Sequence, residues 1–145
     1  MALEVKYFLR RGVKSGSITM ASAAMKDGNE MERLNEIDNN EKISRMFNPK
    51  SIAIVGVASE GFSFGRGILL SHLSIGYEGK LYPVNRRGGT VEGLAAYQSV
   101  EDIPGEIDFA IIAVPAKHVP AAVESCLKKG AAGVEILSSG FRESG

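Results

Sequence analysis

The 145-residue sequence lacks the features of secreted, membrane-spanning and metal-binding proteins. Its single cysteine, Cys126, can form no internal disulfide, and no CxxC pair is present for zinc or redox chemistry. No apolar run approaches the roughly 20 residues that a membrane helix requires. Lysine and arginine together number 17, as do aspartate and glutamate, so no net charge attracts nucleic acid or anionic lipid. These absences predict a cytoplasmic chain that binds no metal, no nucleic acid and no membrane.

The first 48 residues differ in composition from the rest of the chain. Basic and serine residues dominate the stretch before Asp27, which is typical of a disordered or mobile tail, with an organellar presequence as the alternative. We assign this tail to residues 1–37. Residues 38–48 begin with capping residues and place Ile43, Met46 and Phe47 on one helical face, which predicts a short docking helix. Pro49 stops that helix, so the domain is expected to occupy residues 49–145.

Within residues 49–145, apolar runs alternate with helical patterns. Continuous apolar runs predict parallel strands buried on both faces, here at 52–55, 81–84, 107–114 and 134–137. Helical spacing predicts helices at 65–73 and 117–129, and a short strand or hairpin is expected at 91–97. This alternation predicts an α/β fold, a Rossmann-like parallel sheet with helices on both faces. The C-terminal edge of the sheet could be incomplete, because the chain ends just beyond the last strand.

A glycine-rich stretch, residues 56–65, follows the first predicted strand. Glycines allow a tight turn and close approach of the backbone to a phosphate, and helix-start amides can bind the anion. Ser59 and Ser63 could add hydroxyl donors. The spacing Gly56-x-Ala58-x-x-Gly61 approximates a dinucleotide fingerprint, whereas the GxxxxGK[ST] pattern of P-loop enzymes is absent. A glycine loop without a ligand remains the alternative.

The loop after the second predicted strand reads Asn85-Arg86-Arg87-Gly88. NAD-binding sheets place a carboxylate at this point to bind the ribose hydroxyls. Two guanidinium groups stand there instead, and they are suited to bidentate contact with a phosphate monoester. This pattern fits the 3'-phosphate of coenzyme A or the 2'-phosphate of NADP and argues against NAD. Solvated surface arginines are the alternative.

Several motifs, taken in order, resemble one known family. They are KSIAIVGV at 50–57, SFG at 63–65, YPVN at 82–85, GG at 88–89, IAVP at 112–115 and SSGF at 138–141. Together they are similar to the amino-terminal coenzyme-A-binding domain of NDP-forming acyl-CoA synthetases, the superfamily of the succinyl-CoA synthetase α-subunit and the ADP-forming acetate-CoA ligases. The resemblance covers nearly all of residues 50–145. One departure is Gly61-Phe62, where the family often has Pro-Gly, which leaves the detailed shape of the loop open.

The resemblance implies that coenzyme A is the ligand. In that family the glycine loop and the loop after the second strand hold its nucleotide end, and the Val-Pro and Ser-Gly-Phe loops line the pantetheine path. Carried over by position, the implied binding residues are Gly56, Ser59, Ser63, Phe64, Gly65, Asn85, Arg86, Val114, Pro115, Ala116, Ser139 and Gly140.

The family's phosphorylated histidine lies in a following domain, so the resemblance implies that this chain binds coenzyme A or acyl-CoA but does not turn it over alone. The expected partner is a catalytic CoA-ligase domain or subunit. We expect His72 to be a packing or surface residue and His118 to serve the start of a helix; neither has a serine, cysteine or carboxylate pair beside it, so no catalytic residue is assigned. Cys126 is expected to be buried. The alternative function is an NADP-binding oxidoreductase or redox-sensing regulatory domain on the same fold.

Overall fold

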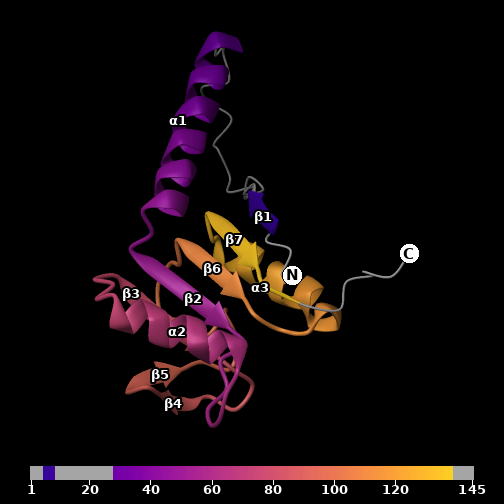
Figure 1. The fold of residues 1–145 in the computed structure, drawn as a ribbon. Coiled ribbons are helices and arrows are strands. Elements are labelled where there is room, and N and C mark those ends of the chain that lie inside the picture. The colour runs from indigo at the N-terminus through magenta and orange to yellow at the C-terminus, as the bar shows by residue number, and fades with distance from the viewer. Residues whose placement is uncertain (1–4, 9–27, 139–145) are drawn as a thin grey trace.

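A parallel β-sheet forms the centre of the molecule. The computed structural model describes residues 5–8 and 28–138. Four strands, β2 (Ser51–Val55), β3 (Lys80–Val84), β6 (Phe109–Ile112) and β7 (Gly133–Ile136), lie parallel in the order β7-β6-β2-β3 (Figure 1). Val55 is in register with Val84 on one side and with Ile112 on the other. The predicted Rossmann-like α/β fold is confirmed.

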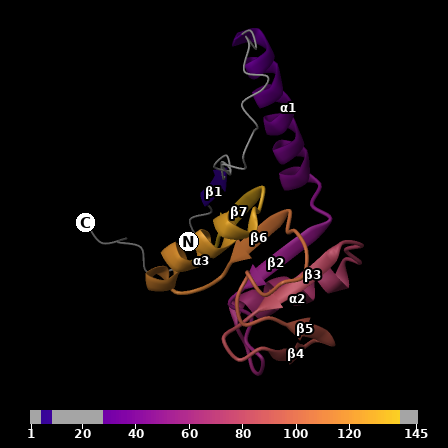
Figure 2. The same cartoon turned by 180° about the vertical axis from the view of Figure 1, so that it is seen from behind.

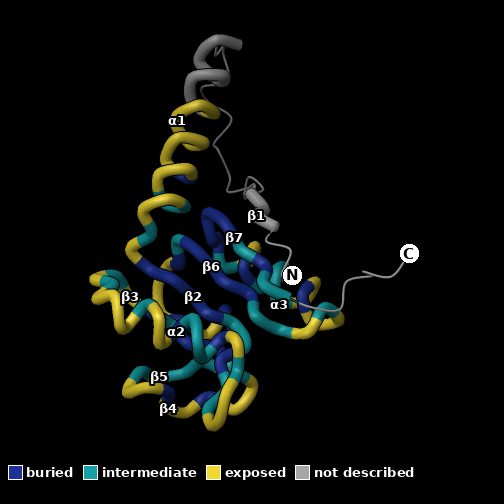
Figure 3. Tube along the Cα trace, viewed as in Figure 1, coloured by how far each residue is buried: buried dark blue, intermediate teal, exposed yellow. Residues whose placement is uncertain are grey.

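Helices cover both faces of this sheet, as alternate side chains of its strands require. On one face, Leu69 of α2 (Phe64–Ser74) packs in a buried cluster with Ile52 and Ile54 of β2. On the other face, Cys126 of α3 (Val119–Lys129) packs in a second buried cluster with Ala53. Figure 2 shows the molecule from the α3 side, and Figure 3 shows that the central strands are buried along their length. The C-terminal ends of β2, β3 and β6 therefore lie between α2 on one face of the sheet and α3 on the other.

Cys126 is fully buried in this second cluster, as expected from the sequence. Burial, with a smaller contribution from the negative charge of Glu101, raises the pKa of its thiol to about 12. The thiol is therefore protonated at neutral pH and acts as a packing group.

A short hairpin follows the sheet's β3 edge. Its strands are β4 (Gly89–Val91) and β5 (Leu94–Ala96), in the stretch where a short strand or hairpin was expected. Tyr97 then forms a bridge with Val84, and its carbonyl oxygen accepts from the Asn85 amide at 2.9 Å. The hairpin is thus attached to the end of β3.

The N-terminal region contains more regular structure than the sequence patterns indicate. Helix α1 runs from Gly28 to Phe47, ten residues more on its N-terminal side than the predicted helix at 38–48. The added turns are rich in helix-forming Glu, Met, Leu and Arg but carry no continuous apolar stripe, so periodicity does not reveal them. Strand β1 (Val5–Phe8) pairs antiparallel with β7. The β7 edge that the sequence left open is therefore paired. Residues 1–4 and 9–27 of the predicted tail lie outside the described residues.

Helix α1 extends away from the sheet and contacts it near its C-terminal end (Figure 1). Met46 packs against the core on the α2 face, where it approaches Gly133 and Phe109. Of the three residues on the apolar face expected from the sequence, Met46 docks, whereas Ile43 and Phe47 are exposed. No helix in the described part of the chain is long and apolar enough to cross a membrane.

Asp108 connects α1 to the start of the sheet. Its Oδ1 accepts from Nε of Arg45 at 2.7 Å, and its Oδ2 accepts from the Lys50 amide at 2.8 Å. The Ser51 hydroxyl also lies 3.3 Å from Oδ2. Burial acts to raise the pKa of Asp108, but the hydrogen bonds from Arg45 and Lys50 outweigh it, so the pKa lies below its ordinary value.

Replacement of Asp108 by asparagine is expected to lower the free energy of unfolding at pH 7 by about 2 kcal/mol, because an amide cannot accept all these charge-assisted bonds. The lowered pKa means that the carboxylate stabilises the fold above the unfolded-state pKa of about 4, and that this contribution is lost as the pH falls through the folded-state pKa. Urea unfolding should therefore separate wild type from Asp108→Asn at pH 7, with the difference shrinking in acid below pH 4. Glu124→Gln, in the exposed pair with Lys128, is the matched control. An Asp108→Asn change no larger than the control's would refute this role.

Candidate functional site

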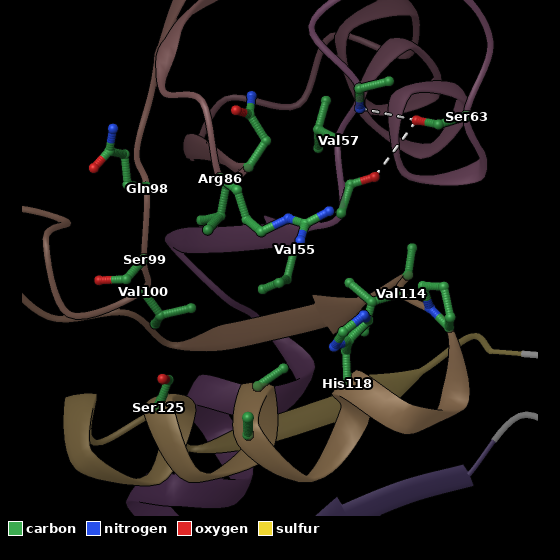
Figure 4. Close-up of a pocket in the computed structure, with 18 residues that line it drawn as sticks. Val55, Val57, Ser63, Arg86, Gln98, Ser99, Val100, Val114, His118 and Ser125 are labelled. Carbon is green, nitrogen blue, oxygen red and sulfur yellow. Dashed lines mark hydrogen bonds between the residues drawn. The ribbon is translucent and has the colours of Figure 1, made fainter.

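A pocket of about 580 Å³ opens at the C-terminal ends of β2, β3 and β6. Its floor is formed by Val55, Val84 and Ala113, which end or follow those strands. Ligands of open parallel sheets bind at this edge because the connecting loops diverge there. Figure 4 shows the lining side chains from the strand ends, the loops and α3. The volume lies in the range of small-molecule sites.

The first loop of the pocket, residues 56–65, is called the glycine loop. Gly56 has φ +99°, and a Cβ at this position would lie 2.3 Å from the Ala113 carbonyl oxygen. A Cβ on Gly65 would lie 2.7 Å from the Gly56 carbonyl oxygen. The loop therefore packs directly against the end of β6 and the start of α2, at positions where only glycine fits.

Ser63 holds the glycine loop in shape. Its Oγ accepts from the Arg66 amide at 3.1 Å, as the N-cap of α2, and from the Ala58 amide at 3.0 Å. The hydroxyl also lies 3.5 Å from the Gly56 carbonyl oxygen, to which it donates (Figure 4). The amides of Gly56 and Val57 both donate to the Val84 carbonyl oxygen. The early loop amides are thus used within the protein, while the first amides of α2 have no intrahelical acceptor.

The second loop, residues 85–88, is called the arginine loop. The Asn85 side chain accepts from the Arg87 amide through Oδ1 at 2.8 Å, but its Nδ2 is buried without a hydrogen-bond partner. Among the described residues, neither Arg86 nor Arg87 has an ion-pair partner. A buried donor without an acceptor is costly, and it lies here beside two free cations. The loop therefore offers donors and positive charge to an anionic ligand.

A smaller pocket of about 300 Å³ lies between these two loops. One wall is formed by residues 57–60 of the glycine loop, the other by Asn85, Arg86 and Arg87. Asn85 and Arg86 line both this pocket and the larger one. We call this space the anion cleft.

The opposite side of the larger pocket is formed by one face of α3. His118, at the N-cap of α3, lines the pocket, and Ala121, Ala122 and Ser125 follow at helical spacing. Gln98, Ser99 and Val100 face them from the segment after β5. In Figure 4, Ser99 and Ser125 lie at one end of the pocket and Ser63 at the other, with Arg86 between them. No carboxylate is among the described lining residues of this pocket.

The structure brings together part of the site that the sequence implies. Six of the implied binding residues line the larger pocket: Gly56, Ser63, Asn85, Arg86, Val114 and Pro115. Ser59 lines the anion cleft. Phe64, Gly65 and Ala116 line neither space: Phe64 is 54% exposed, and Gly65 is buried beneath the loop. Ser139 and Gly140 lie outside the described residues.

Four polar lining residues were not assigned to the site from the sequence: Gln98, Ser99, His118 and Ser125. The sequence places His118 at the start of a helix, and it does precede α3, but its side chain makes no capping hydrogen bond. The helical spacing of His118, Ala121, Ala122 and Ser125 was the signal that could have found this wall, because small residues on a helix face leave room for a ligand.

The other candidate groups have structural surroundings. His72 Nδ1 lies 2.9 Å from the Ile68 carbonyl oxygen, and its ring packs edge-on against Tyr77. This fits the expected packing role. Within the described residues, no group of three His, Cys, Asp or Glu side chains is placed to hold a metal ion.

Comparison with known proteins identifies the family of this region. The model of the CoA binding domain family matches residues 50–144. The α-subunit of ADP-forming acetate-CoA ligase I from Pyrococcus furiosus is 45% identical over 107 residues, 71% of this chain and 23% of that protein. ADP-forming acetate-CoA ligase II from Archaeoglobus fulgidus is 44% identical over 100 residues, 69% of this chain and 15% of that protein. The chain thus spans less than a quarter of these relatives' lengths.

A solved structure gives the same result for the fold. Dinucleotide-forming acetyl-coenzyme A synthetase 1 of Candidatus Korarchaeum cryptofilum, determined with phosphate and ADP, matches with a TM-score of 0.61 and 36% identity. The match covers 70% of this chain and 22% of that one. The family model, which matches residues 50–144, spans all the described loops and strands that form the pocket. The chain therefore belongs to the CoA binding domain family.

Proposed function

We propose that residues 50–144 bind coenzyme A in the pocket at the C-terminal edge of the sheet. The observation that carries the proposal is the buried, unpartnered Nδ2 of Asn85. Asn85 and its neighbour Arg86 both line the larger pocket and the anion cleft. A phosphate oxygen of the coenzyme would accept from this amide and from the guanidinium group. Arg86 is exposed and can meet the phosphate directly, whereas the Asn85 side chain would have to rotate to present its buried Nδ2.

The two spaces fit different parts of the coenzyme. The anion cleft offers Ser59, Arg86 and Arg87 to phosphate groups, with Glu60 as the one carboxylate among its described lining residues. The larger pocket has apolar walls, formed in part by Val55, Val84 and Val100, and polar groups at its ends. That combination suits a flat or elongated organic group with few hydrogen-bonding edges. Val114 and Pro115 also line the larger pocket, and we place the pantetheine arm beside them.

The wider role proposed for the chain is that of the coenzyme-binding module of an NDP-forming acyl-CoA ligase. Two of its relatives are named ADP-forming acetate-CoA ligases, and the chain spans only a small part of each. Coenzyme A or acyl-CoA would be held here for a catalytic ligase domain or subunit, which supplies the phosphoryl transfer chemistry. No residue of the described pocket is proposed to form a covalent intermediate.

The proposal is tested by calorimetric titration of the full chain with coenzyme A, dephospho-coenzyme A and NADP. We expect coenzyme A to bind about tenfold or more tightly than dephospho-coenzyme A, because the 3'-phosphate meets an arginine that has no ion-pair partner among the described residues. Higher salt should narrow the difference, since exposed charges are screened.

The same titrations decide between coenzymes. NADP carries a phosphate monoester on its ribose, so the arginine loop alone does not exclude it. Binding of NADP more tightly than coenzyme A would overturn the proposal in favour of the oxidoreductase or redox-sensing alternative. Absence of coenzyme A binding at millimolar concentration would overturn it outright.

A further inference from the structure

The side chain of Arg66 joins three segments around the candidate site. Its Nε and Nη2 donate to Oε1 of Glu92 at 2.8 and 2.5 Å, and its Nη1 donates to the Gly61 carbonyl oxygen at 3.1 Å. Arg66 belongs to the first turn of α2, Gly61 to the glycine loop, and Glu92 to the turn between β4 and β5. All three nitrogen atoms of the guanidinium group therefore have acceptors within the protein.

Glu92 has an unusual backbone conformation. Its φ is +50°, and within the described residues it is the one non-glycine residue with positive φ. This left-handed region is unfavourable for a residue with a Cβ, and such residues are retained mainly where neighbouring structure holds them. The side chains of Arg66 and Glu92 are 27% and 25% exposed, so their contact is partly sheltered from water. The Arg66 contact is a reason for a glutamate at a position that favours glycine or asparagine.

The β4–β5 turn is mechanically connected to the arginine loop. Strand β4 begins directly after that loop, and the Asn85 amide donates to the Tyr97 carbonyl oxygen just beyond β5. The hairpin is therefore anchored to Asn85 at both of its ends. On the other side, the bond to Gly61 attaches Arg66 to the glycine loop. The anion cleft lies between these two loops, and the Arg66 bridge joins Gly61, directly after the first wall, to the hairpin that directly follows the second.

We propose that Arg66 and Glu92 form a clamp that sets the width of the anion cleft and positions the glycine loop for the coenzyme's phosphates. The inference rests on the proposed function. Arg66 is a positioning residue, because its guanidinium nitrogens are bonded to Glu92 and Gly61 and it lines neither the larger pocket nor the anion cleft. Its effect on binding passes through the relative placement of the two loops.

Glu92→Gly in the full chain separates this role from a role in folding. Glycine adopts φ +50° without strain, so the turn is kept while the carboxylate is lost. We expect coenzyme A binding to weaken about tenfold by calorimetry, with a urea-unfolding midpoint no lower than that of wild type. Arg66→Ala should weaken binding at least as much, because it also removes the bond to Gly61. The double variant should bind no more weakly than Arg66→Ala, because both changes remove the Arg66–Glu92 contact.

Lys128→Ala is the matched control, since it removes the Lys128–Glu124 pair at 2.9 Å on α3 and should leave the affinity unchanged. Binding by Glu92→Gly that equals or exceeds wild-type binding would refute the clamp, because Arg66 would then act through its charge alone. Fully additive losses in the double variant would refute it as well. Failure of the wild-type chain to bind coenzyme A is a distinct result that overturns the proposed function, and the clamp with it.

Discussion

Gly56→Ala is expected to lower the free energy of unfolding by about 3 to 5 kcal/mol, the largest stability loss foreseen for a single methyl group in this chain. Alanine is strained at φ +99°, and its Cβ would lie 2.3 Å from the Ala113 carbonyl oxygen and 2.9 Å from Val114 Cγ1. The first of these atoms belongs to the backbone at the end of β6, which cannot rotate away. Because domains are stable by only about 5 to 15 kcal/mol, much of the variant should be unfolded in mild urea.

Gly61→Ala provides the matched control for this prediction. Gly61 lies in the same loop with φ +71°, but a Cβ added there meets nothing within 4 Å. Its replacement should cost only the backbone strain, about 1 to 2 kcal/mol. Urea-unfolding midpoints of the two variants should therefore differ clearly. If both variants lost the same stability, the close approach of the glycine loop to β6 would not be what requires glycine at position 56.

The buried strands could be predicted from sequence because their apolar runs have a single physical cause. A parallel strand covered on both faces needs consecutive apolar residues, and Ile52, Ala53 and Ile54 meet this need, with exposures of 4% or less. The glycine-rich turn belongs to the same strand–loop–helix unit, since the chain must leave β2 and enter α2 within a few residues. The alternation of strands and helices therefore predicts both the fold class and the position of the pocket.

The N-terminal elements could not be predicted because their signals are weak or non-local. Helix α1 carries mainly polar residues over its length, so no apolar period marks its start. Its attachment depends on Arg45 meeting Asp108, 63 positions later in the chain. Strand β1 is defined by pairing with β7 at the far end of the sequence. Tertiary contacts, which a local pattern does not report, determine both elements.

The candidate site was predictable in its loops and less so in its walls. Glycine and arginine at strand ends have a direct physical meaning, and Gly56, Asn85 and Arg86 do line the pocket. Ser63 was expected as a ligand donor, yet its hydroxyl caps α2 and holds the Ala58 amide. The α3 wall was missed because His118 and Ser125 are polar residues on a helix, a pattern that usually indicates solvent. Only the placement of α3 beside the strand ends directs them toward the pocket.

Arg86→Ala is expected to weaken coenzyme A binding about 100-fold, equivalent to about 2.7 kcal/mol. Arg86 lines both the larger pocket and the anion cleft, and no described carboxylate pairs with it, so its charge is available to a phosphate monoester. Arg87 lines the cleft alone, and Arg87→Ala should have the smaller effect. Arg86→Lys should bind coenzyme A more tightly than Arg86→Ala but less tightly than wild type, because lysine keeps the charge and loses the bidentate hydrogen bonding of the guanidinium group.

Titration with dephospho-coenzyme A turns this test into a double-mutant-type cycle, in which the protein loses Arg86 and the ligand loses its 3'-phosphate. If the Arg86 guanidinium group binds the 3'-phosphate, wild type and Arg86→Ala should bind dephospho-coenzyme A almost equally, because the partner of the arginine is then already absent. An equal loss with both ligands would contradict that assignment and would place Arg86 against the diphosphate instead. Asn85 distinguishes the two outcomes further, because it lines both the larger pocket and the anion cleft and its Nδ2 is buried without a partner. Asn85→Ala should weaken the binding of both coenzyme A and dephospho-coenzyme A only if Nδ2 contacts a group that the two ligands share. Coupling of Arg86 to the 3'-phosphate, together with an Asn85 effect common to both ligands, would place the nucleotide end of coenzyme A across the anion cleft.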